Sequence, residues 1–168
     1  MVKTETNIMN AIFRRMIGPV QYLLIAICFV SCDLIEYHPY DLGSKNQPSN
    51  LNQTNINILK RNEDNQDTVR FIFMGDTQRH YDETEDFVNA INKRNDIDFV
   101  IHGGDITDFG MSKEYLWVHN IMKKLKVPYV ALIGNHDVLG HGKDVYEKIY
   151  GDFNFSFKFR KTRFICLN

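Results

Sequence analysis

The chain has 168 residues, of which 43% are hydrophobic, and its 20 basic and 21 acidic residues leave a net charge of −1. This composition is that of an ordinary globular protein with apolar material for one modest domain. A chain so close to neutral lacks the basic surface that long nucleic acids require, so we expect no nucleic-acid partner.

The amino terminus has the pattern of a secretory signal. Three basic residues, an apolar run over residues 23–30 and the pair Ser31-Cys32 follow one another, as in a signal peptide. The run is shorter than the roughly twenty residues that a transmembrane helix needs. We therefore expect residues 1–31 to be a signal peptide, and its removal leaves 17 basic against 20 acidic residues.

The segment Phe29-Val30-Ser31-Cys32 resembles a bacterial lipobox, with phenylalanine where leucine is usual. In such a motif the cysteine is lipidated and becomes the mature amino terminus, so a lipid on Cys32 would anchor the protein to a membrane. The sequence thus predicts an exported lipoprotein of the cell envelope that faces the periplasm or the cell surface. Cys166 would remain as a single thiol, so we expect no disulfide framework.

Residues 32–67 have the composition of a linker. Asparagine recurs through the segment, Pro39 and Pro48 interrupt it, and apolar residues follow no period. Low hydrophobicity leaves too little apolar surface to offset the entropy lost on ordering. We expect a polar, Asn-rich tether between the membrane and a domain over residues 68–168, although residues 34–37 are apolar enough to form a docking arm instead.

Three runs rich in Val, Ile, Phe and Tyr predict buried strands over residues 69–74, 99–102 and 127–133. Periodicity and capping residues predict helices over 82–95, 112–127 and 143–150. Residues 153–159 then alternate phenylalanine with polar residues, and 163–167 would return as the second strand of a hairpin. The fold class is therefore α/β, with a β-α-β-α-β core of parallel strands and a C-terminal hairpin.

Each parallel strand is followed by a turn that carries carboxylate or amide side chains. The turns are Gly75-Asp76-Thr77-Gln78, Gly103 to Asp108, and Gly134-Asn135-His136-Asp137. Singly, each is ordinary turn chemistry. Parallel strands bring all three to one edge of the sheet, where ligands bind in open α/β sheets. The set therefore predicts a metal site built from Asp76, Asp105 and Asn135.

These turns resemble the motifs of the calcineurin-like metallophosphoesterases, which run Asp-x-His, Gly-Asp-x-x-Asp and Gly-Asn-His-Asp or Gly-Asn-His-Glu. The resemblance covers residues 69–168 and implies a four-layer α/β/β/α sandwich, of which this chain would be the N-terminal half. The family's later histidines would lie beyond Asn168. We therefore expect a domain truncated at its C-terminus, whose missing half is its partner and whose uncovered sheet face is apolar.

The resemblance also implies a ligand set for two divalent metal ions. Asp76 would bind one ion, Asp105 would bridge the two and Asn135 would bind the second. Gln78 stands where most of the family has histidine, and an amide oxygen is a harder ligand that favours Mn²⁺ or Mg²⁺ over Zn²⁺. We expect Mn²⁺ first, with Fe, Zn or Mg as alternatives. If Gln78 is only a polar loop residue, the first ion is weak or absent.

By the same resemblance, His136 would stabilise charge or protonate the leaving oxygen, and the carboxylate of Asp137 would hold its ring. Asp108 would brace its loop. The implied function is two-metal hydrolysis of a small phosphorylated substrate, such as a phosphomonoester, a phosphodiester or a nucleotide diphosphate. The truncated chain would be inactive by itself. The alternative is a non-catalytic surface lipoprotein of the same fold that binds a phosphorylated or sugar ligand.

Overall fold

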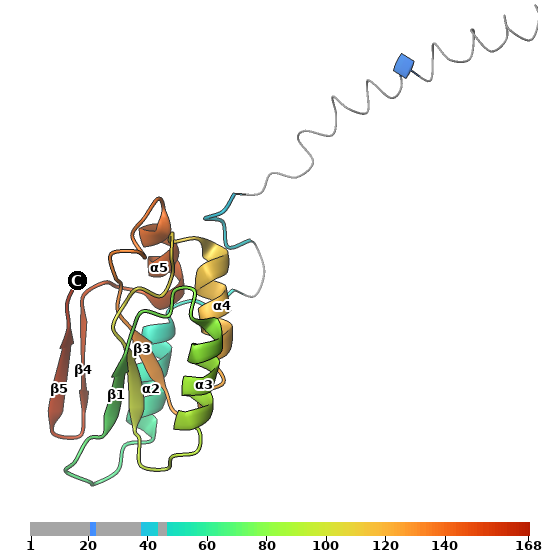
Figure 1. Ribbon diagram of the computed structural model, residues 1–168. Helices are drawn as coiled ribbons and strands as arrows, with labels where there is room; N and C mark the ends of the chain where they lie inside the picture. Colours follow the sequence, from blue (N-terminus) through green and yellow to red (C-terminus); the bar gives the residue numbers. More distant parts are fainter. Residues whose placement is uncertain (1–20, 23–37, 44–46) are drawn as a thin grey trace, which may run out of the picture. The chain divides into compact units, whose positions relative to one another are not determined.

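The computed structural model describes residues 21–22, 38–43 and 47–168. Nearly all of the predicted signal peptide, the lipid acceptor Cys32 and the docking arm at 34–37 lie outside the described residues. The chain divides into the units Met1–His38 and Pro39–Asn168, and the second unit carries the sheet and its helices (Figure 1). Within the described ranges, no helix has the length and apolar character needed to cross a bilayer.

A parallel three-stranded sheet forms the centre of the second unit. Its strands lie in the order β1-β2-β3, and Ile101 of β2 stands between Phe73 of β1 and Val130 of β3. All four residues of β2 are buried, because the sheet is covered on both faces. The predicted parallel β-α-β-α-β core is confirmed. The strands are β1 (Phe71–Met74), β2 (Phe99–His102) and β3 (Tyr129–Ala131).

Three helices cover one face of this sheet. Val88, Val118 and Val145, one from each helix, are buried together with Val100 of β2. The helices begin near the predicted positions, but the first two end four or five residues early, where the chain turns back toward the sheet. The helices are α3 (Tyr81–Ile91), α4 (Ser112–Met122) and α5 (Gly142–Tyr150).

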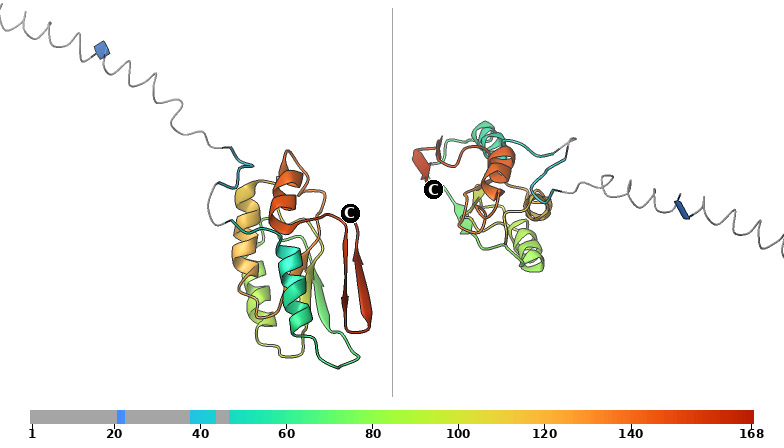
Figure 2. Two further views of the ribbon diagram at one scale, coloured as in Figure 1. Left: turned by 180° about the vertical axis from the view of Figure 1, so that it is seen from behind. Right: turned by 90° about the horizontal axis from the view of Figure 1, so that it is seen from above.

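A hairpin and a further helix cover the other face. Phe99 of β2 makes edge-on ring contacts with three hairpin phenylalanines, 157, 159 and 164, at centroid distances of 5.8, 6.1 and 5.2 Å. The hairpin stands on the side of the sheet away from α3 and α4 (Figure 2). The predicted hairpin is thus confirmed, while the four-layer sandwich stays a prediction. The elements are α2 (Leu51–Arg61), β4 (Phe155–Phe159) and β5 (Thr162–Cys166).

Helix α2 lies inside the range 32–67, so the prediction of a tether is wrong for residues 51–61. Ile56 and Leu59 are buried against the hairpin side of the sheet. The Asn52 amide donates to the carbonyl of Ala131 at 2.9 Å and accepts from its N–H at 2.8 Å. An asparagine that counts as polar in the composition therefore takes the place of a neighbouring strand beside β3.

Candidate active site

The three turns meet at the carboxyl edge of the sheet, and Asp105 joins them. Its carbonyl accepts a hydrogen bond from the N–H of Gln78 at 3.3 Å. Its carboxylate accepts one from the N–H of His136 at 3.0 Å. The N–H of Asp76 also donates to Gly104 at 3.2 Å. The residues that the sequence places in three separate turns therefore lie around one point of the fold.

Backbone conformation sets this close approach. Asp76 and Asp105 have φ of 56° and 53°, in the left-handed region that costs most residues about 1 kcal/mol or more and that aspartate tolerates better than most. A Cβ at Gly134 would lie 2.2 Å from the backbone nitrogen of Asp105. Only glycine at position 134 allows the second and third turns to touch. Such strained carboxylates cluster at functional sites.

The exposure of the side chains suits a cation site open to solvent. Asp76 and Asn135 are exposed, and Asp105 and Gln78 are partly buried. The Oε1 atom of Gln78 is buried and has no hydrogen-bond partner within residues 47–168. A buried acceptor without a partner costs about 1–3 kcal/mol, and a hard cation would remove that cost. The donor chemistry therefore fits a divalent metal ion.

Within the described part of the chain, no group of three or more His, Cys, Asp or Glu side chains is arranged to hold a metal. The predicted ligand set explains this finding, because only Asp76 and Asp105 are carboxylates. The other two, Gln78 and Asn135, are amides. The predicted set therefore offers oxygen donors from two carboxylates and two amides.

The ring of His136 has a defined tautomer. Its Nδ1 lies 3.1 Å from the main-chain carbonyl of Asp108. A carbonyl can only accept, so Nδ1 carries the proton and Nε2 is the basic nitrogen of the neutral ring. An oxygen of the Asp108 carboxylate lies 3.9 Å from the same Nδ1. Asp108 is therefore the residue that orients His136.

Asp137 is fully buried. Its carboxylate accepts hydrogen bonds from backbone N–H groups and not from the His136 ring. Its oxygens accept from the N–H groups of Ile106, Thr107 and Gly134 at 3.1, 2.8 and 2.9 Å, and from the Thr107 hydroxyl at 2.8 Å. Burial raises the pKa of the Asp137 carboxyl, and these hydrogen bonds oppose that shift. Asp137 thus clamps the second turn to the third.

The expected role of Asp137 is wrong. The sequence predicts that its carboxylate holds the His136 ring, but the ring meets the main-chain carbonyl of Asp108, and the Asp137 carboxylate braces the second turn. The sequence reasoning also missed Arg79, whose Nε donates to Asp108 at 2.6 Å. The one sequence signal for Arg79 was its position directly after the candidate ligand Gln78. Its partner Asp108 lies 29 residues away, and residue periodicity does not reveal a contact at that separation.

His102, the last residue of β2, links the first turn to the second. The N–H of Gly104 donates to its Nδ1 at 3.2 Å, so its Nε2 carries the proton toward the Thr77 hydroxyl 2.9 Å away. Thr77 in turn donates to the carbonyl of Ile106 at 3.3 Å. Burial lowers the pKa of His102 to about 4, so the ring is neutral and serves as a support, not as a ligand.

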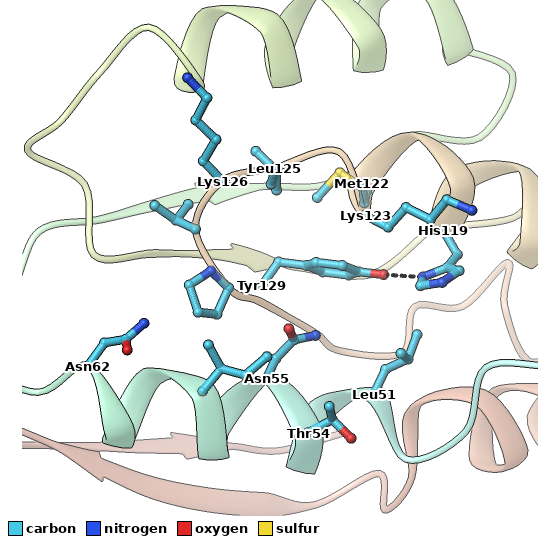
Figure 3. Close-up of a pocket in the computed structure, with 13 residues that line it drawn as sticks. Leu51, Thr54, Asn55, Asn62, His119, Met122, Lys123, Leu125, Lys126 and Tyr129 are labelled. Carbon is cyan, nitrogen blue, oxygen red and sulfur yellow. Dashed lines mark hydrogen bonds between the residues drawn. The ribbon is translucent and has the colours of Figure 1, made fainter.

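A separate groove of about 270 Å³ lies between α2 and the segment that joins α4 to β3 (Figure 3). Leu51 and Ile58 form one wall, and Pro128 and Tyr129 lie at the amino end of β3. The Tyr129 hydroxyl is 2.8 Å from Nδ1 of His119. The turns stand at the opposite end of the strands, so this groove is not part of the candidate site.

Comparison with known proteins places these turns in a family. The model of the calcineurin-like phosphoesterase family matches residues 69–167. A probable cyclic nucleotide phosphodiesterase of Xenorhabdus bovienii is 32% identical over 88 residues, which are 52% of this chain and 33% of that protein. A probable cyclic nucleotide phosphodiesterase of Moraxella catarrhalis is 35% identical over 66 residues, 35% of this chain and 24% of that protein.

The uncharacterized protein YvnB of Bacillus subtilis is 28% identical over 126 residues, which are 65% of this chain and 10% of that protein. The chain therefore spans about a third or less of the length of each of these relatives. The family model covers more than half of the chain and includes all three turns. The chain belongs to the calcineurin-like phosphoesterase family.

Proposed function

We propose that this chain contributes the metal-binding turns of a phosphoester hydrolase that depends on divalent cations. Family membership and the names of two relatives support phosphoester chemistry. The single observation that carries the proposal is the junction at Asp105, which joins the turns beside the unpartnered oxygen of Gln78.

Four oxygen donors would hold the cations. Asp105 would bridge two ions because it lies between the other two turns, and Asp76 and Gln78 would hold one ion and Asn135 the other. Hard donors of this kind favour Mn²⁺ or Mg²⁺, with Fe or Zn as weaker fits. When bound, such cations act as Lewis acids toward the phosphoryl group and supply the nucleophile at neutral pH.

His136 would serve the leaving oxygen. Because the Asp108 carbonyl keeps the proton on Nδ1, it is Nε2 that gains a proton to give to the leaving group. The clamp formed by Asp137 keeps the backbone of His136 at its distance from Asp105. Asp137 is therefore proposed as a supporting residue and His136 as the acid.

Small phosphodiesters are the substrate class that we propose first. Two relatives carry the name probable cyclic nucleotide phosphodiesterase, and phosphomonoesters and nucleotide diphosphates are the other candidates. The alternative function, a surface lipoprotein that binds a phosphorylated or sugar ligand without turnover, predicts one bound metal ion or none.

Metal titration of the purified chain tests the proposal directly. Calorimetry with Mn²⁺ should show two sites in the wild type and a loss of binding in Asp105→Asn, whereas Asp96→Asn, at the opposite end of the strands, should bind as the wild type does. Hydrolysis of bis(p-nitrophenyl) phosphate and of a cyclic nucleotide is then measured with Mn²⁺ on the complete protein, because the chain is expected to be inactive by itself. A wild-type chain that binds no divalent cation would show the proposal to be wrong.

We also propose that Cys32 carries a lipid that anchors the protein in the cell envelope, on the basis of the lipobox-like segment at residues 29–32. The wild-type protein should enter the detergent phase on phase separation, and Cys32→Ser should stay in the aqueous phase. Equal partitioning of the two proteins would contradict the anchor.

A further inference from the structure

We infer that Arg79 is a positioning residue for His136 and acts through Asp108. The inference rests on the proposed function, because it concerns the histidine of that site. Nε of Arg79 lies 2.6 Å from Oδ2 of Asp108, and Nη2 contacts the same oxygen. The other carboxylate oxygen, Oδ1, faces His136, so Asp108 stands between the guanidinium and the imidazole.

This pair differs from an ordinary surface ion pair. Exposed pairs contribute little to stability, but the Asp108 side chain is only 13% exposed, against 71% for Arg79. A carboxylate so shielded gains more from its partner, since less water competes for it. Arg79 has φ of 63°, and its side chain reaches from the first turn to Asp108 in the second.

The ion pair with Arg79 determines which oxygen of Asp108 accepts the hydrogen bond from the His136 ring. The main-chain carbonyl of Asp108 accepts from Nδ1 at 3.1 Å, whereas the carboxylate stays at 3.9 Å. By holding the carboxylate, Arg79 ties residue 108 to the first turn and keeps the carbonyl in front of the ring. Without Arg79, the Asp108 side chain loses this partner and can turn toward His136, so the oxygen that meets Nδ1 can change.

Kinetics can distinguish positioning of His136 from direct binding of the substrate phosphate by Arg79. A guanidinium that bound the phosphate of the substrate directly would raise KM when removed. A guanidinium that positions His136 affects the step in which the ring gives up its proton, so its loss lowers kcat and leaves KM nearly unchanged. The two roles can therefore be separated by measurement.

The first test observes the ring in the metal-free full chain by ¹⁵N-histidine NMR. The Nδ1–H signal of His136 is identified by its absence in His136→Gln. Arg79→Asn removes the guanidinium with a residue that tolerates the left-handed conformation. We expect this variant to shift or broaden the Nδ1–H signal, Arg79→Lys to restore part of the wild-type signal, and Arg94→Asn to leave it unchanged.

Arg94 is a matched control because it forms an exposed two-point pair with Asp96, at 2.9 and 2.8 Å, away from the turns. A wild-type His136 signal in Arg79→Asn would overturn the inference. This arm needs neither metal nor turnover, so it gives an answer even if the proposed hydrolase activity is absent.

The second test is a kinetic cycle with Mn²⁺ and bis(p-nitrophenyl) phosphate, run on the complete protein. Positioned proton transfer contributes about 10²–10⁴-fold to rates, so partial misplacement in Arg79→Asn should lower kcat by about 10-fold, with KM within about twofold. In an Asp108→Ala background the same change should have no further effect, because its route to His136 is gone. A raised KM with unchanged kcat, or full additivity of the two changes, would overturn the inference.

Discussion

The buried carboxylate of Asp137 governs how the second and third turns stay together. It accepts four hydrogen bonds from donors of those two turns. In Asp137→Asn an amide NH₂ would face an N–H donor, so at least one hydrogen bond is replaced by a repulsive contact. We expect a loss of about 2–4 kcal/mol of unfolding free energy, because hydrogen bonds to charged groups are worth about 1.5–3 kcal/mol each.

Urea unfolding measures this loss. Asp144→Asn is the control, since Asp144 is an exposed carboxylate in the first turn of α5, and its loss should change stability by less than about 0.5 kcal/mol. Equal stability of the wild type and Asp137→Asn would show that the clamp does not hold the two turns.

His102 makes stability depend on pH. Its pKa is lowered to about 4 in the folded protein by burial, whereas an unfolded histidine titrates near 6.5. Between these values the unfolded chain binds the extra proton, so the free energy of unfolding falls as pH decreases from about 6.5 to about 4, by up to roughly 1.4 kcal/mol per pH unit. Below that window the histidine contributes no further change.

Denaturant unfolding at several pH values, in a chelator, tests this slope. His102→Asn should be less stable at neutral pH but should lose less stability on acidification than the wild type. The raised pKa of Asp137 makes both proteins more stable as the pH falls, which is opposite to the effect of His102. Because Asp137 is present in both proteins, its effect cancels when their pH profiles are subtracted. Parallel pH profiles would contradict the assignment of a neutral, buried His102.

The three turns were predictable from sequence, because each follows a recognisable strand. The orientation of the side chains was not. Asp137 is next to His136 in the chain, yet neighbouring residues of a tight turn point in different directions, and the ring meets residue 108 instead. Contacts between side chains about thirty residues apart depend on tertiary packing, and residue patterns do not record them.

At the scale of elements, α2 protects one edge of the sheet. The two hydrogen bonds between Asn52 and the backbone of Ala131 are buried. Asn52→Ala would leave the N–H of Ala131 without a partner, whereas its carbonyl would keep the hydrogen bond from the Tyr146 hydroxyl at 2.7 Å. A buried N–H without a partner costs about 1–3 kcal/mol, and we expect a loss of unfolding free energy in that range.

Chemical denaturation compares this variant with Asn57→Ala, which removes an exposed asparagine of the same helix. The control should lose less than about 0.5 kcal/mol. Hydrogen exchange at the N–H of Ala131 gives a second measurement, since the amide should exchange faster only in Asn52→Ala. Unchanged exchange there would show that the Asn52 side chain does not cover the edge.

Periodicity predicted the strands and the hairpin because their alternation or apolar runs are strong signals. It failed for α2, whose apolar residues are few and whose asparagines resemble those of a linker. The deciding contact, between residues 52 and 131, satisfies the polar groups of a side chain and a strand at once. Composition counts the asparagine as polar and cannot register that its polarity is used in the core.

At the scale of the whole folded unit, the two edges of the sheet differ. The β3 edge is covered by Asn52, whereas β1 has a single strand partner, β2, among the described residues. Phe73 of β1 is 66% exposed, and its ring lies over Gly103, where a Cβ would come within 2.4 Å of it. The four residues of β1 carry no charge that would oppose pairing with another strand.

We therefore expect the purified unit 39–168 to self-associate through β1 as its concentration rises. Phe73→Lys should reduce this association, because an edge lysine opposes strand pairing while its aliphatic stem can still cover Gly103. Sedimentation velocity across a concentration series measures the effect. Trp117→Lys is the matched control, since Trp117 is 51% exposed but lies on α4. If both variants reduce association equally, general surface hydrophobicity is the cause and the open edge of β1 is not.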